Sequence, residues 1–120
     1  MTSSAEESDL LVSNENNDPF FEKIGSSILV ECRNVKKPFS AKDARDFKGK
    51  ISNLGLNCGV IISKRGLSGR MNHDAKLEIR DSRKDGVIII PLEIHDIEFI
   101  ANGADPLKIM KKKYYDLFQF

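Results

Sequence analysis

Cysteine is scarce in this chain, and its scarcity excludes two classes of small protein. Only two cysteines occur among the 120 residues, Cys32 and Cys58, and both lie in or beside apolar stretches. Two cysteines do not form a disulfide framework, so we interpret them as buried thiols in a reducing compartment. The cysteines and the two scattered histidines also lack the paired ligand spacing that a zinc site requires.

Long apolar runs are missing as well. The longest candidate, residues 87–92, has the length of a strand, whereas a membrane-spanning helix needs about 20 apolar residues. The chain does not open with a basic segment followed by an apolar one, so nothing supports secretion. We therefore expect a cytoplasmic protein that has no membrane partner.

The composition is that of an ordinary globular domain. Hydrophobic residues make up 40% of the chain and charged residues 31%, which is too apolar for a fully disordered protein. We expect residues 1–8, which are polar, to be disordered and residues 9–120 to form one domain. An open alternative is that this domain is a fragment of a larger protein with further domains.

The net charge of +1 conceals an uneven distribution of charge. Residues 1–22 carry six acidic side chains and no lysine or arginine, and the remaining residues carry 19 basic and 12 acidic side chains. A basic body with an acidic N-terminal segment is compatible with a nucleic-acid partner. Many ordinary solvated surfaces are also basic, so this charge alone does not identify the partner.

Four apolar runs predict strands, and the segments between them predict an α/β fold. The runs lie at residues 9–13, 28–33, 58–62 and 87–92, and Pro91 indicates that the last run ends there or lies at an edge. The turn-rich segment after the first run favours an antiparallel hairpin, whereas strand–helix–strand units favour parallel neighbours. We therefore predict a mixed sheet, with an antiparallel hairpin leading into parallel strands, flanked by helices.

Capping residues mark the starts of three predicted helices. Ser40, Asp96 and Asp105 are suitable N-caps, and Pro106 suits the first helical position after Asp105. A weaker helical pattern covers residues 71–84. The helix after Ser40 has one apolar stripe at helical spacing, which is formed by Ala44, Phe47, Ile51 and Leu54.

Charged residues end the second predicted strand, which is otherwise apolar. Glu31 and Arg33 lie two positions apart and therefore project from the same face. If the first strand pairs alongside, Asp9 can lie beside Glu31, and two converging carboxylates can hold Mg²⁺. The alternative is that Glu31 and Arg33 form an ion pair of little energetic weight and that Asp9 caps a strand end.

These residues resemble a known family. Asp9-Leu-Leu-Val, a variable hairpin, Ile28-Leu-Val-Glu-Cys-Arg-Asn34 and a helix that begins at Ser-Ala-Lys-Asp are similar to the PD-(D/E)XK nuclease superfamily. The Mrr-like restriction endonuclease domains are the closest branch, and the resemblance covers about residues 7–92. It implies a restriction endonuclease-like fold and a Mg²⁺-dependent endonuclease that cleaves DNA.

The resemblance also implies roles for individual residues. Asp9, Glu31 and the backbone carbonyl of Cys32 would be metal ligands, and Asp9, Glu31 and Arg33 would be catalytic. Arg33 stands where the family has lysine, and arginine stays protonated, so it is suited to orient a phosphate rather than to deprotonate water. Lys48 is a candidate substitute lysine, although a solvated position beside the helix stripe is the simpler interpretation.

Basic side chains near the implied site are candidate DNA contacts, with ordinary solvated loops as the alternative. They are Lys36, Lys37, Lys48, Lys64 and Arg65. The leading hypothesis is therefore DNA phosphodiester hydrolysis. Because of Arg33, the first alternative is a catalytically degenerate module that binds DNA or serves as a structural or oligomerisation domain. A module that binds only proteins is a further alternative, and the sequence leaves open whether the chain forms a homodimer.

Overall fold

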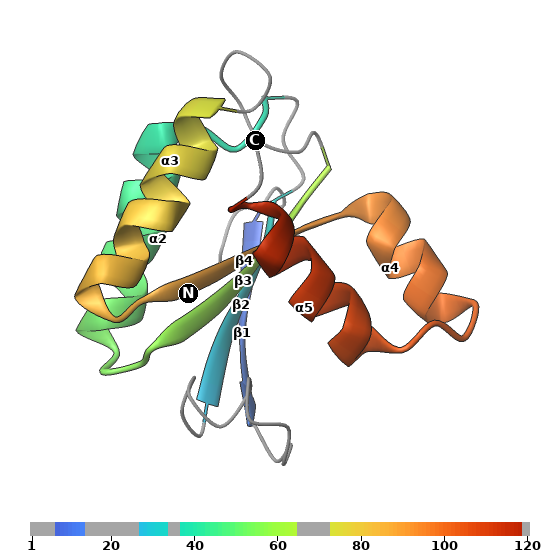
Figure 1. The fold of residues 1–120 in the computed structure, drawn as a ribbon. Helices are drawn as coiled ribbons and strands as arrows, with labels where there is room; N and C mark the ends of the chain where they lie inside the picture. The colour runs from blue at the N-terminus through green and yellow to red at the C-terminus, as the bar shows by residue number, and fades with distance from the viewer. Residues whose placement is uncertain (1–6, 14–26, 34–36, 65–72, 119–120) are drawn as a thin grey trace.

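In the computed structural model, the described part of the chain is centred on a mixed sheet of four strands (Figure 1). The structure describes residues 7–13, 27–33, 37–64 and 73–118, the first of these ranges by its backbone. The strands are β1 (Glu7–Ser13), β2 (Ser27–Arg33), β3 (Cys58–Ser63) and β4 (Ile88–Glu93), and they lie in that order across the sheet.

The strand directions define a mixed sheet. β1 pairs antiparallel with β2, and β2–β3 and β3–β4 are parallel pairs. The α/β class that the sequence predicts is therefore confirmed. β1 begins at Glu7, so residues 7 and 8 belong to a strand rather than to the disordered segment predicted for residues 1–8, and residues 1–6 lie outside the described part of the chain.

Helices cover both faces of the sheet (Figure 1). One side carries α2 and α3, and the other side carries α4 and α5. A short 3-10 helix, η2, follows α3. The bounds are α2 (Ala41–Asn53), α3 (His73–Ser82), η2 (Arg83–Asp85), α4 (Ile94–Ala101) and α5 (Pro106–Asp116). Within the described ranges, no helix is long and apolar enough to cross a membrane.

The helix starts largely follow the predicted capping chemistry. The Ser40 hydroxyl accepts a hydrogen bond from the Asp43 backbone N–H at 3.1 Å, and the Asp43 carboxylate accepts one from the Ser40 N–H at 2.9 Å. Asp105 caps α5, with Pro106 as the first helical residue. Asp96 is not an N-cap as predicted: it is the third residue of α4, and its carboxylate accepts a hydrogen bond from the Glu93 N–H.

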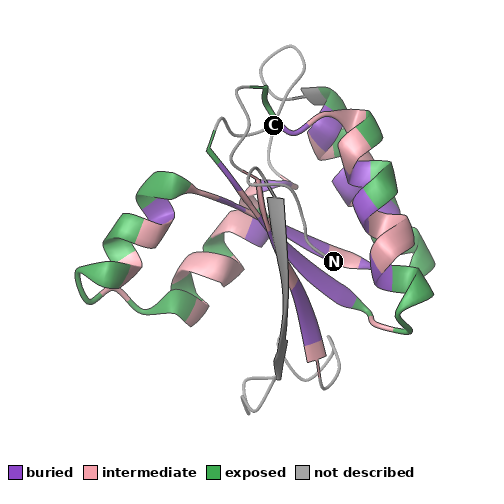
Figure 2. Cartoon of the chain, turned by 180° about the vertical axis from the view of Figure 1, so that it is seen from behind, coloured by how far each residue is buried: buried purple, intermediate pink, exposed green. Residues whose placement is uncertain are grey.

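The hydrophobic core lies between the sheet and the helices, where buried positions concentrate (Figure 2). The prediction for the α2 stripe holds for Ala44, Phe47 and Ile51, which are at most 2% exposed. It is wrong for Leu54, which is 56% exposed because it is the C-cap, where the helix ends and the chain turns away through left-handed Gly55 (φ 73°).

Gly59 on β3 allows α2 to lie very close to the sheet. A Cβ atom at this position would be 2.5 Å from Ile51 Cδ1 and 2.6 Å from Phe47 Cζ. Real atoms do not approach so closely, so the missing side chain is what lets the buried stripe of α2 rest on the strand. This close approach also brings the polar flank of α2 within reach of the neighbouring strand, β2.

Candidate functional site

Glu31 is the buried acid of the candidate site. It lies on β2 and is only 4% exposed, although the strand around it is apolar. Its Oε1 lies 2.7 Å from Nζ of Lys50 on α2. A buried carboxylate needs such a partner because burial strongly disfavours an isolated charge.

Arg33, two residues further along β2, pairs with the same helix. Its Nη1 lies 2.9 Å from Oδ1 of Asp43, and its guanidinium carbon lies 5.9 Å from the centre of the Phe39 ring. The Arg33 side chain is 20% exposed and the Asp43 side chain is 25% exposed. Arg33 is thus held between a carboxylate and an aromatic ring rather than extended into solvent.

The spacing of the charges on α2 matches their spacing on β2. Asp43 and Lys50 are seven residues apart, which is about two helical turns and places them on the same side of α2. They pair with Arg33 and Glu31 in reverse order, because α2 runs back along the strand. The result is a polar seam of two ion pairs beside the apolar stripe of α2.

Asp43 has the second role of closing the capping box of α2. Burial alone would raise the pKa of its carboxyl. The hydrogen bond from the Ser40 backbone N–H, the Arg33 guanidinium and the Ser40 hydroxyl outweigh this effect and hold the pKa below its usual range. Asp43 is therefore a stable anion that fixes both the start of α2 and the position of Arg33.

The strand register places Asp9 at the site. The Cα partner of Asp9 on β2 is Glu31, and the Cα partners of Cys32 are Ser8 on β1 and Ile62 on β3. The prediction that residue 9 lies beside Glu31 is thus confirmed for the backbone. Asp9, Glu31 and the Cys32 carbonyl would be oxygen donors, which is the ligand type that Mg²⁺ prefers.

The described side chains alone do not make a metal centre. Among them, no group of three or more His, Cys, Asp or Glu side chains could hold an ion. The ammonium of Lys50 already neutralises the buried Glu31 carboxylate. The oxygen donors of Asp9, Glu31 and the Cys32 carbonyl are of the type that binds Mg²⁺. A bound ion would share the Glu31 carboxylate with Lys50.

Lys48, the substitute lysine suggested by the sequence, points elsewhere. Its ammonium pairs with Asp85 of η2, on the side of α2 that faces α3. Of the two interpretations of Lys48, this placement favours a position on the flank of the helix over a substitute lysine at Glu31. Lys50, which the sequence reasoning missed, occupies the place instead. The available signal was its position seven residues after Asp43 on the same flank of the apolar stripe.

The remaining candidate DNA contacts divide into two groups. Lys37 and Lys64 are exposed, and the Lys64 backbone N–H donates to the Arg33 carbonyl at 3.4 Å. Lys64 thus begins the segment after β3 directly beside the end of β2. Lys36 and Arg65 lie outside the described residues.

Comparison with known proteins adds no family to this geometry. No protein-family model, no curated protein and no solved structure matches the chain.

Proposed function

We propose that this chain is a restriction endonuclease-like domain that hydrolyses DNA phosphodiester bonds with Mg²⁺. The observation that carries the proposal is the contact of Lys50 with the buried Glu31 at 2.7 Å, at the point where the strand register places Asp9. The PD-(D/E)XK pattern needs a lysine beside its second acid. This chain has Arg33 at that sequence position, and Lys50 supplies the ammonium from the neighbouring helix.

Each residue then has a distinct role. Asp9, Glu31 and the Cys32 carbonyl would hold Mg²⁺, which when bound polarises a phosphate and activates water. Arg33, fixed by Asp43 at 2.9 Å, would orient the phosphate through its planar fork of donors. Lys50 would exchange a proton with water, because an amine can be deprotonated and a guanidinium cannot.

Basic residues around the site would hold the DNA strand. Lys37 and Lys64 are exposed near the end of β2, and in this proposal Lys36 and Arg65 extend the same contact. Such contacts supply affinity and register without sequence information. The proposal therefore includes no recognition sequence.

The test is cleavage of supercoiled plasmid in Mg²⁺ and in Mn²⁺. We expect the wild type to cleave, Glu31→Gln to be inactive and Lys50→Arg to lose roughly 10²–10⁴-fold in rate, the usual contribution of a proton-transfer group. Lys50→Arg keeps the charge that Glu31 needs, so loss of folding is not its expected effect. Lys48→Arg, on the other flank of the same helix, is the matched control and should cleave like the wild type.

Two outcomes would contradict the proposal. Cleavage that survives Glu31→Gln would remove the acid from the mechanism. Equal rates for Lys50→Arg and Lys48→Arg would remove Lys50 from it. Thermal unfolding of each variant, followed by circular dichroism, shows whether the comparison is between folded proteins.

A second candidate function is a DNA-binding module of the same fold without catalysis. The specific observation in its favour is that both charged residues of β2 pair with α2, Glu31 with Lys50 and Arg33 with Asp43. Two such pairs also serve simply to hold the helix on the sheet. This candidate predicts a wild type that is silent in both metals and a DNA affinity that falls as salt rises. Cleavage restored by Arg33→Lys would identify a relict site.

A further inference from the structure

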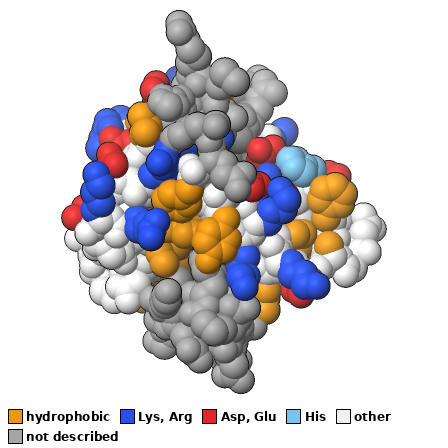
Figure 3. Space-filling view, viewed as in Figure 1, with side chains coloured by type: hydrophobic (Ala, Val, Ile, Leu, Met, Phe, Trp, Pro, Cys, Tyr) orange, Lys and Arg blue, Asp and Glu red, His pale blue; other side chains and the backbone are white. Residues whose placement is uncertain are grey.

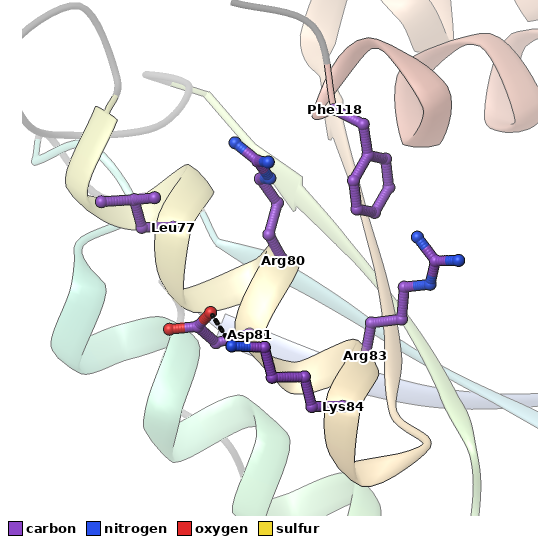
Figure 4. A pocket seen from close by; sticks show the side chains of 6 residues that line it. All are labelled: Leu77, Arg80, Asp81, Arg83, Lys84 and Phe118. Carbon is purple, nitrogen blue, oxygen red and sulfur yellow. Dashed lines mark ion pairs between the residues drawn. The ribbon is translucent and has the colours of Figure 1, made fainter.

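A groove of about 420 Å³ lies between α3–η2 and the end of α5, apart from the candidate site (Figure 4). It is lined by Leu77, Arg80, Asp81, Arg83, Lys84 and Phe118. α3 and α5 both contact β4, whereas Glu31 lies on β2 with β3 between them. Strands are spaced about 4.8 Å apart, so roughly 10 Å of sheet separates the groove from Glu31.

Two arginines share one aromatic ring in this groove. The guanidinium carbons of Arg83 and Arg80 lie 5.1 and 5.6 Å from the centre of the Phe118 ring. Figure 4 shows the ring directed between the two side chains. The ring is itself anchored, because it packs edge-on against buried Tyr114 with the ring centres 5.2 Å apart. The core thus fixes the ring, and the ring positions the guanidinium groups.

Charged side chains of α3 and η2 face two directions, some toward α2 and others toward the groove. The acids Glu78 and Asp85 pair with Arg45 and Lys48 of α2. The groove side holds three basic side chains and a single acid, Asp81, which lies 3.5 Å from Lys84. Figure 3 shows apolar side chains between α3 and α5 with lysines and arginines around them. The groove is therefore a positively charged surface with an apolar floor.

We propose that this groove binds the phosphate backbone of duplex DNA as a contact separate from the cleavage site. An arginine fork held against a ring is prepared for a phosphate, because it loses little freedom when it donates two hydrogen bonds to the phosphate oxygens. Leu77, which is 40% exposed, and the ring add apolar contact surface beside these charges. The choice of DNA as the polyanion rests on the proposed function.

The test is fluorescence anisotropy of labelled duplex DNA with the full chain over a series of salt concentrations. Chelator is present throughout, so cleavage does not enter the measurement. Arg83→Gln removes one charge from the groove, and Lys112→Gln removes one exposed charge from α5 outside it. The logarithm of the association constant falls as the logarithm of the salt concentration rises. This negative slope should become shallower by about 0.9 for Arg83→Gln, the value for one lost phosphate contact, and stay at the wild-type value for Lys112→Gln.

The Phe118→Leu variant tests the contribution of the aromatic ring independently of the charges. It keeps every charge, so the salt slope should stay at the wild-type value while the affinity falls several-fold, because the arginines are no longer held in place. Circular dichroism melting curves show whether each variant is folded.

The outcomes distinguish this proposal from the proposed function. Equal salt slopes and equal affinities for Arg83→Gln and Lys112→Gln would overturn the groove as a DNA contact, even if the wild type cleaves plasmid. A reduced slope for Arg83→Gln alone would support the groove, even if the wild type is silent in the cleavage assay.

Discussion

Replacing Gly59 with alanine changes one hydrogen into a methyl group at the place where α2 rests on β3. The new Cβ would lie 2.5 Å from Ile51 Cδ1 and 2.6 Å from Phe47 Cζ, both in side chains that are at most 2% exposed. Neither side chain has open space to move into. Ordinary contact begins at 3.4 Å, so the added Cβ and its neighbours must move apart by about 0.9 Å.

Overpacking of a filled core costs about 1–3 kcal/mol. The loss of glycine from a strand returns about 0.5–1 kcal/mol, because alanine has less conformational freedom in the unfolded chain. We therefore expect Gly59→Ala to lower the free energy of unfolding by up to about 2.5 kcal/mol. The assay is urea unfolding followed by circular dichroism, with the slope of the transition checked for two-state behaviour.

Gly49→Ala is the matched control, because it is the same substitution on α2, the helix that packs against Gly59. No atom lies within 4 Å of the added Cβ at this helical position. Alanine in a helix interior is favoured over glycine by up to about 1 kcal/mol, so this variant should be more stable than the wild type. If Gly59→Ala is as stable as Gly49→Ala, the close contact between α2 and β3 does not exist as described.

Three further predictions concern stability and reactivity. Asp43→Asn should cost about 1–2 kcal/mol near pH 6, because it removes the negative charge that strengthens the capping box and pairs with Arg33. The depressed pKa of Asp43 gives stability that is present above the unfolded pKa and is lost as the pH falls through the folded pKa. The difference between wild type and variant should therefore shrink towards pH 3, and urea unfolding at several pH values measures it; a difference independent of pH would contradict this assignment. Burial raises the pKa of the Cys58 thiol to about 12, so an alkylating reagent at pH 8 should modify Cys58 only after denaturation, as peptide mass spectrometry would show. Ile51→Ala should cost about 2–5 kcal/mol, whereas Leu54→Ala should cost under about 0.5 kcal/mol; equal losses in denaturant unfolding would restore Leu54 to the stripe.

Local chemistry made the strands and helix starts predictable from the sequence. A strand needs a continuous apolar run when it is covered on both faces, and residues 58–62 and 87–92 lie within a residue of β3 and β4. Ser40 and Asp105 cap their helices because their side chains can reach a backbone N–H within the same turn. Asp96 failed as an N-cap because the same carboxylate can serve a capping box from the third helical position.

The orientation of α2 about its own axis was not predictable from its sequence. Lys48 and Lys50 lie on opposite flanks of the apolar stripe, and periodicity treats the two flanks alike. Only the placement of β2 beside one flank and η2 beside the other decides that Lys50 reaches Glu31 and Lys48 reaches Asp85. The sequence thus anticipated the register of Asp9 with Glu31 and did not anticipate the contact of Lys50 with Glu31.

Pro91 lies within β4, which is the last strand of the sheet in the described part of the chain. Proline has no backbone N–H, so a strand added along that edge would meet a missing donor in the middle of its hydrogen-bond ladder. The β1 segment Glu7–Ser13 contains no proline. A strand that extends the sheet would therefore be disfavoured at β4, whereas no proline opposes such pairing at β1, next to the strand that carries Glu31.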